Sequence, residues 1–388
     1  MTEYVSHDYH YAGLDDLPDV LARPPWRPRR HPPRTILHRT APNRPLTLDW
    51  RPGERQQWAE TALREEKYWR DNAAAILGHT ADTWMSYKLA NALAVAPEEL
   101  ALPHLRAFRP CRLGGYVAPH RRLLGRFGVQ ALDFVVSAVQ HNTWLAEVLA
   151  PIDGTAVSIF WARWLHSGRR RTAAGMQWFD RHIDTAATDL IATALTRSGK
   201  DRVPAEHALR TLATAGHGEA IQAAAAAYHP QAPTAVDAIL HVDPLLLLPK
   251  RIPQPRQWIA LDRLVKVRLR EKNAVLPVSA IADLVSMLMM CRPGNDYAGV
   301  RAVVEATEHT TLAGFARSLL DQWAQAGCPE KDEWVLHAQV LLGDDRTVSY
   351  LRDLTTRWSR MADAGRAATE ALQNGRMRTL TLRKYLEA

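Results

Sequence analysis

The sequence has few cysteines, and their positions exclude two classes of small stabilised domain. Its three thiols, Cys111, Cys291 and Cys328, lie far apart and never form a Cys-x-x-Cys pair. An odd, dispersed set does not build a disulfide framework or a zinc ribbon, and it is typical of proteins from a reducing compartment. We therefore expect free thiols, a cytoplasmic location and a fold that is held together by its own apolar core.

Long hydrophobic runs are missing as well. A membrane helix needs roughly 20 apolar residues, and no apolar run here approaches that length; the leucine run at residues 245–248, for example, is short and flanked by prolines. The first residues lack a charged segment followed by an apolar stretch, so we expect no signal peptide. The sequence predicts a protein without a membrane partner.

Motifs that bind nucleotides or carry catalysis are also absent. Ser198-Gly199-Lys200 lacks the first glycine of a phosphate-binding loop, and neither Gly-x-Ser-x-Gly nor His-Glu-x-x-His occurs. The densest group of metal-ligand types, residues 7–11, is typical of a solvated N-terminal tail. Asp344 and Asp345 could share acid–base work, but after Gly343 we interpret them as helix caps. We expect no catalytic residue, no cofactor and no metal, and hence no enzyme.

What the sequence does contain is a basic, proline-rich segment near its N-terminus. Prolines alternate with arginines from residue 23 to residue 45, and this segment contributes much of the net charge of +8. Proline fixes φ and removes a backbone donor, so we expect an extended arm. Arginines release counterions from phosphate and tryptophan stacks on bases, so the candidate contacts to a partner or nucleic acid are Trp26, Arg27, Arg29 and Arg30. A solvated linker explains the same composition.

A second basic group, Arg169, Arg170 and Arg171, lies between two expected helices. These arginines are the other candidate contacts to a partner or nucleic acid. A solvated loop between helices is the alternative interpretation.

Helical spacing of apolar residues dominates the chain after residue 50, as in Val129, Leu132, Val136 and Val139. We expect four segments: an N-terminal segment with the arm (1–50), a first helical block (51–228), a proline-rich connector (229–276) and a second helical block (277–388). Within the connector, residues 263–270 alternate with period two, which fits a strand, a helix end or an extended connector. Helical pairs of roughly 30–40 residues predict an all-α fold, an irregular α-solenoid of HEAT-like hairpins.

Several short blocks, taken in order, resemble a known family. They include Arg23-Pro24-Pro25-Trp26-Arg27, Val242-Asp243-Pro244-Leu245 and Trp323-Ala324-Gln325-Ala326-Gly327-Cys328-Pro329. With these blocks the chain resembles the helical middle region of bacterial molybdate metabolism regulator-like proteins, which carry a DUF4132 domain and often a WGR domain. The WGR domain itself has no counterpart here.

The resemblance implies a place in a multiprotein assembly, with a MoxR-type AAA+ ATPase and a VWA-domain protein as partners. Together with the missing catalytic motifs, it predicts a non-enzymatic scaffold that binds other proteins. The alternative is a regulatory protein that binds nucleic acid in a basic groove of the solenoid.

Overall fold

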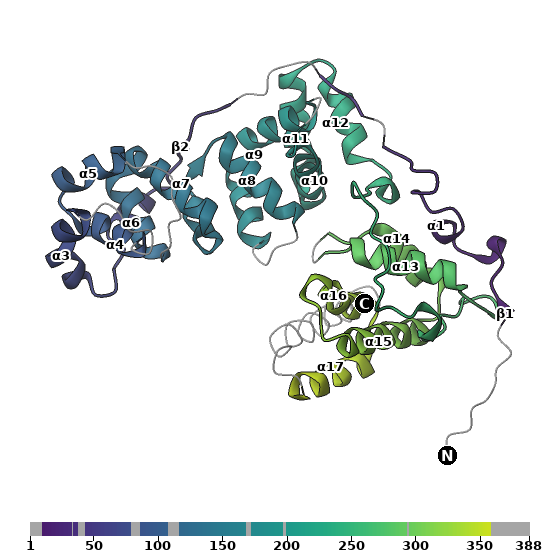
Figure 1. Cartoon of the computed structure of the whole chain (residues 1–388). Coiled ribbons are helices and arrows are strands. Elements are labelled where there is room, and N and C mark those ends of the chain that lie inside the picture. Colours follow the sequence, from purple (N-terminus) through teal and green to yellow (C-terminus); the bar gives the residue numbers. More distant parts are fainter. Residues whose placement is uncertain are drawn as a thin grey trace, which may run out of the picture. The chain divides into compact units, whose positions relative to one another are not determined.

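The computed structural model describes residues 10–32, 34–37, 43–78, 86–107, 116–167, 172–196, 199–292 and 295–357. The chain is mostly helical and divides into two compact units (Figure 1). Unit 1 joins Met1–Pro33 to Val242–Ala388, and unit 2 is Arg34–His241. Unit 2 is therefore inserted, along the sequence, between the two parts of unit 1.

The first half of unit 2 consists of short helices, in which α3 packs on α4 while α6 packs on both α2 and α4. Its elements are β2 (Thr47–Leu48), α2 (Glu54–Ala59), α3 (Glu66–Gly78), α4 (Ser86–Val95), α5 (Glu98–Ala107) and α6 (Val117–Phe127). Helices α2 and α6 approach closely at Gly125, where an added Cβ would lie 2.2 Å from the backbone nitrogen of Ala59. Only glycine leaves room for this contact.

In the second half of unit 2, the helices from α8 to α12 pack on their neighbours or next neighbours along the chain (Figure 1). Its elements are α7 (Leu132–His141), β3 (Ile152–Asp153), α8 (Thr155–His166), α9 (Thr172–Ala194), α10 (Arg202–Leu212), α11 (Gly218–Tyr228) and α12 (Ala232–Leu240). Strand β3 pairs antiparallel with β2. Trp161 and Trp164 share one buried face of α8, with ring centroids 5.4 Å apart, so both rings belong to the core of unit 2.

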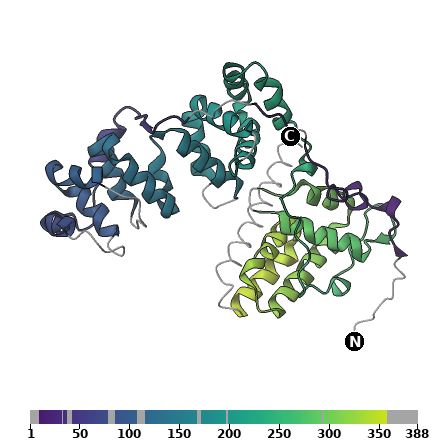
Figure 2. The same cartoon turned by 45° about the horizontal axis from the view of Figure 1, so that its top comes forward.

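Unit 1 is built around an apolar helix, α13 (Val278–Met290), in which nine of the 13 residues are buried. The helices that follow it are α14 (Ala298–Ala306), α15 (His309–Gln325), α16 (Trp334–Leu342) and α17 (Asp345–Arg357). Helix α15 packs against α16, and Figure 2 shows the yellow-green helices of this unit running side by side. The core of unit 1 is separate from that of unit 2.

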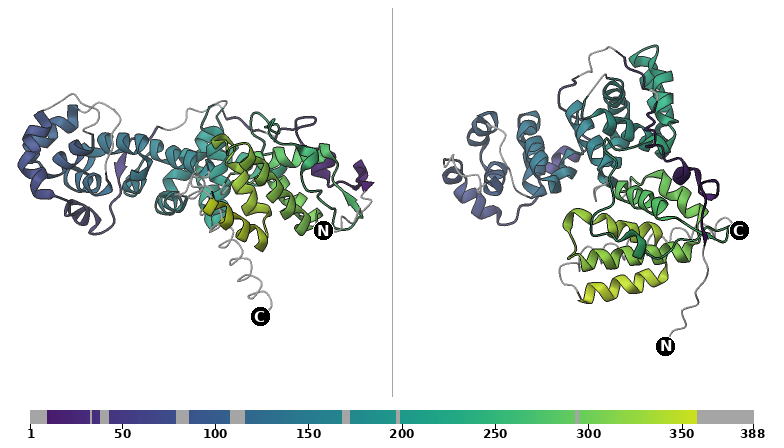
Figure 3. Two further views of the ribbon diagram at one scale, coloured as in Figure 1. Left: turned by 60° about the horizontal axis from the view of Figure 1, so that its bottom comes forward. Right: turned by 45° about the vertical axis from the view of Figure 1, so that its right-hand side comes forward.

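The N-terminal residues complete unit 1. Strand β1 (His10–Tyr11) pairs in parallel with β4 (Ala274–Val275), and α1 (Asp19–Ala22) packs against α13 and α14. Figure 3 shows this purple segment beside the green helices of the same unit. Val20 and Leu21 are buried there, in a core whose other residues come mainly from positions after 258.

The segment 263–270 is an extended connector with two isolated bridges, Arg268 to Val275 and Leu269 to Thr307. Its period-two pattern has a plain cause, because Val267 and Leu269 point into the core while Arg268 and Arg270 are more exposed. Of the three alternatives, the extended connector describes the segment.

The two units divide the chain differently from the four expected segments. Helix α12 lies within the expected connector, yet Ala232, Ala235 and Val236 are buried in the core of unit 2. Leu245 and Leu248 pack instead on the core of unit 1. The boundary between residues 241 and 242 is therefore set by which of the two cores the apolar side chains pack into. The proline content of the sequence does not reveal this boundary. Within the described residues, no helix is long and apolar enough to span a bilayer.

Candidate functional site

The N-terminal part of the arm is bound to unit 1 through Trp26 and Arg27. The indole ring of Trp26 is half-buried, 6.2 Å from the ring of Tyr297, and its nitrogen hydrogen bonds to Asp283. The guanidinium of Arg27 donates to the same carboxylate at 2.7 Å. Burial raises the pKa of Asp283, and the charge of Arg27 and the bond from Trp26 oppose that rise without cancelling it. Two of the candidate contacts thus hold the arm against helix α13.

Arg29 and Arg30 lie in the turn that follows. Arg29 donates to the carbonyl oxygens of Pro249 and Lys250, at 2.6 and 2.9 Å. Arg30 is exposed. The turn therefore lies beside the exposed Lys250 and Arg251. We define the basic surface of unit 1 as Arg27, Arg29, Arg30, Lys250 and Arg251.

The later part of the arm is bound to unit 2 by Arg44. Its guanidinium donates to both oxygens of Asp153, at 2.8 and 2.9 Å, and to both oxygens of Asp189, at 2.8 and 3.2 Å. Thr155 and Ser158 each donate a further bond of 2.8 Å to Asp189, which is fully buried. Burial opposes the ionisation of Asp153, but the bonds from Arg44 prevail and lower the pKa of that carboxyl. Arginines of the described arm are therefore bonded to unit 1 and to unit 2. This differs from the alternative interpretation of the arm as a solvated linker.

Arginine pairing is general for the buried acids. In the described ranges, five carboxylates are buried, and every one of them is bonded to an arginine. The pairs are Asp153 and Asp189 with Arg44, Glu206 with Arg202, Asp283 with Arg27, and Asp332 with Arg256. A buried charge is costly unless it is paired and hydrogen-bonded, so these arginines are structural counterions.

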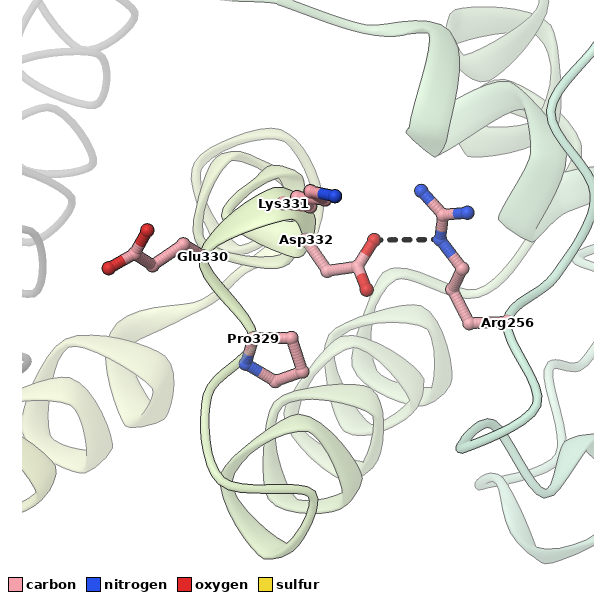
Figure 4. Close-up of a pocket in the computed structure, with 5 residues that line it drawn as sticks. All are labelled: Arg256, Pro329, Glu330, Lys331 and Asp332. Atoms are coloured by element: carbon pink, nitrogen blue, oxygen red, sulfur yellow. Dashed lines mark hydrogen bonds and ion pairs between the residues drawn. The ribbon is translucent and has the colours of Figure 1, made fainter.

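The Asp332–Arg256 pair lines a surface pocket of about 510 Å³ together with Pro329, Glu330 and Lys331. Figure 4 shows Asp332 and Arg256 pointing toward one another, while Glu330 points away. Asp332 accepts from Arg256 at 2.9 Å and from the indole nitrogens of Trp258 and Trp334 at 3.1 and 3.2 Å. These three donors together lower its pKa despite burial. The carboxylate is saturated by the chain itself, so it serves as an anchor for the loop that carries Arg256.

A second pocket of about 510 Å³ lies beside α15. Asp321 lines it and accepts a hydrogen bond from the hydroxyl of Tyr350, and burial raises the pKa of this carboxyl. Gln322 bridges both backbone groups of Ala260, at 2.7 and 3.1 Å. Asp321 and Gln322 are thus both engaged in hydrogen bonds within unit 1.

The remaining sequence candidates have structural roles where they are described. Asp344 accepts a hydrogen bond from the backbone N–H of Thr347 at 2.9 Å and forms an ion pair with Arg317. Asp345 is the first residue of α17, so the predicted capping is confirmed. Cys291 is a free, buried cysteine, and burial raises the pKa of its thiol to about 12. Burial also raises the pKa of the half-buried Cys328 thiol. Neither thiol has the lowered pKa of an activated nucleophile.

Some candidates lie outside the described residues, namely Arg169, Arg170 and Arg171, His7 and Cys111. Within the described part of the chain, no three His, Cys, Asp or Glu side chains are grouped so that they could hold a metal ion. Sequence reasoning did not identify the carboxylates that receive the arm. Their signal was present, because Asp189 and Asp283 interrupt otherwise apolar or small-residue helix faces.

Comparison with known proteins gives one relative. The chain is 30% identical over 197 residues to the uncharacterized protein YehI of Escherichia coli (strain K12). The match covers 50% of this chain but only 16% of YehI, so the chain spans a small part of that protein's length. No family model matches the chain, and no solved structure is significantly similar to it.

Proposed function

We propose that the chain is a non-enzymatic interaction protein, an irregular α-solenoid of HEAT-like hairpins that binds other proteins. The proposal depends above all on the pairing of the five buried carboxylates with arginines. A general acid or base must exchange a proton with its substrate, whereas these groups are held by donors of the chain. The packing of neighbouring helices on one another from α8 to α12 supports the solenoid.

The basic surface of unit 1 is the proposed contact to a partner. Within the described residues, Arg30, Lys250 and Arg251 are exposed and form no ion pair. Such uncompensated charges favour an acidic partner and speed its association. The ring of Trp26 is packed on Tyr297 and the core of unit 1, which makes it a poor platform for stacking a base. We therefore favour an acidic protein segment over nucleic acid.

The proposed setting is a cytoplasmic assembly with an AAA+ ATPase and a VWA-domain protein, as the family resemblance implies. The test is affinity purification of the tagged chain, at its natural level, from cells that express it. A variant with Arg30→Glu and Lys250→Glu reverses two charges of the basic surface. A control with Lys331→Glu and Arg346→Glu makes the same net change at exposed positions elsewhere in unit 1.

The wild-type chain and the control should recover the ATPase and the VWA-domain protein, and the basic-surface variant should lose them. Recovery of no stable partner by the wild type, or equal recovery by all three chains, would contradict the proposal.

Nucleic-acid binding is tested on the same three proteins with fluorescently labelled duplex and single-stranded DNA. Phosphate contacts give an affinity that falls steeply between about 50 and 200 mM salt. Salt-sensitive binding that only the basic-surface variant loses would move the assignment to the nucleic-acid alternative. If none of the three proteins binds DNA at low salt, the result favours the protein-binding proposal over the nucleic-acid alternative.

A further inference from the structure

Helices α8 and α10 of unit 2 bring two histidines together. They pack side by side (Figure 1), and the ring centroids of His166, at the end of α8, and His207, on α10, are 5.4 Å apart. Arg210 follows His207 by three residues, so both project from the same face of α10. Three basic side chains thus converge where two helices meet.

Among the described residues, little negative charge lies near this cluster. Glu206 is the carboxylate whose charge reaches Arg210, and it is already bonded to Arg202 at 2.8 Å. The neighbouring Arg163 of α8 is paired with Asp201. The described residues supply no hydrogen-bond acceptor to the Arg210 guanidinium.

The cluster is also partly removed from solvent. All three side chains are half-buried. Burial lowers the pKa of Arg210 and of His166, and it lowers the pKa of His207 to about 4. The charge of Arg210 lowers the pKa values of both histidines further. A bonded anion would supply the negative charge and the acceptor that the described residues do not give to the Arg210 guanidinium.

We propose that His166, His207 and Arg210 form a binding site for a phosphate-type oxyanion, either free phosphate or a phosphomonoester group of a larger ligand. A guanidinium and two imidazolium groups offer charge-assisted donors to several oxygens of one tetrahedral anion. His207 keeps one ring N–H on the carbonyl of Leu165, which leaves its other nitrogen for the ligand. The site lies in unit 2, and it is independent of the basic surface proposed above for partners.

The test is isothermal titration of the full chain with sulfate and with inorganic phosphate, at about pH 5.5 and about pH 8. Sulfate keeps its charge over this range, so any pH dependence of sulfate binding belongs to the protein. Binding should be at least about tenfold tighter at the lower pH, because the anion favours protonated imidazoles. Ring resonances of His166 and His207 in ¹H–¹⁵N spectra should shift as the site fills.

Variants locate the site. Arg210→Gln should abolish binding, Arg210→Lys should retain part of it, and His207→Gln should weaken the dependence on pH. Arg346→Gln, an exposed position in unit 1, is the matched control and should bind as the wild type does. Circular dichroism verifies that each variant is folded. If Arg210→Gln does not fold, the reduced affinity of Arg210→Lys tests the site instead.

Two further titrations distinguish the sources of the anion. A 5′-phosphorylated dinucleotide that binds more tightly than free phosphate would assign the site to a phosphomonoester ligand. Equal or weaker binding would assign it to the free anion. The inference is overturned if the wild type shows no saturable sulfate or phosphate binding at about pH 5.5, or if Arg210→Gln binds as tightly as the wild type.

Discussion

The guanidinium of Arg27 lies 2.7 Å from a carboxylate oxygen of Asp283, which follows it by 256 positions in the chain. The side chain of Asp283 is 4% exposed and that of Arg27 is 57% exposed. The carboxylate therefore carries most of the desolvation in this pair, and the arginine arrives from the surface to balance it. The arm has the composition of a linker, yet the buried carboxylate of Asp283 on the apolar helix α13 holds it in place.

Arg27→Gln should destabilise unit 1 by roughly 1 kcal/mol, a modest cost because the arginine is well solvated. The raised pKa of Asp283 determines at which pH this carboxyl contributes to the stability of unit 1. Stability from a raised pKa is present below the unfolded value and is lost as pH rises through the folded value. At neutral pH, Asp283→Asn should therefore cost less than Arg27→Gln. Urea denaturation of the two variants measures both costs.

The double variant Arg27→Gln, Asp283→Asn completes the cycle. It should be more stable than Arg27→Gln alone, because no buried charge is left unpaired. If the two single changes are instead additive, the pair does not hold the arm.

Arg44→Gln should be more damaging, by about 3–5 kcal/mol, because it leaves Asp153 and Asp189 without their shared counterion. The effect is pH-dependent. The lowered pKa of Asp153 contributes stability that is present above its ordinary value of 3.8 and is lost as pH falls through the lower folded value. The gap between wild type and variant should thus narrow toward acid pH in urea titrations.

The control for Arg44 is Arg301→Gln, which breaks an exposed pair with Glu305 on α14. This change should cost less than about 0.5 kcal/mol. Equal losses from both variants would show that the buried network contributes no more than a surface ion pair.

Much of the fold follows from local pattern. Helical spacing predicted the mostly helical chain, and Gly343 with Asp344 predicted the start of α17. Caps and apolar periodicity act over a few residues, and sequence displays them directly. What the sequence did not reveal is where the arm lies, because its contacts are long-range. Pairing of Arg44 with Asp189 spans 145 positions, and no local rule selects one carboxylate among 41 acidic residues.

The candidate site shows the same limit. Arginine and proline content predicted a basic arm, and the exposed Arg30 agrees with that expectation. Composition could not separate Arg30 from Arg27, which is committed to Asp283. The cluster around His207 was also invisible, because His166 reaches it from a different helix.

Acid should destabilise unit 2 through His120. This ring is fully buried, stacks on Phe134 and bonds to the carbonyl of Tyr116 at 2.8 Å, and burial lowers its pKa from 6.5 to about 4. At a pH between these two pKa values, His120 is protonated in the unfolded chain but neutral in the folded chain. The free energy of unfolding therefore falls as the pH drops, by roughly 3 kcal/mol in all. His120→Leu should remove most of this loss in denaturation curves between about pH 7 and pH 4. The exposed His241→Gln serves as the control, and equal pH profiles for wild type and His120→Leu would reject the assignment.

Gly125→Ala should destabilise unit 2 by about 3 kcal/mol, at the upper end of overpacking costs. The new Cβ would lie 2.2 Å from the nitrogen and 2.7 Å from the Cα of Ala59. These atoms belong to the backbone of α2, so no side chain can rotate to make room, and α2 and α6 must move apart. Gly218→Ala is the matched control, because its Cβ meets nothing within 4 Å and alanine favours the helix by about 0.5–1 kcal/mol. Urea denaturation should show opposite signs for the two glycines, and a neutral Gly125→Ala would mean that α2 and α6 do not approach this closely.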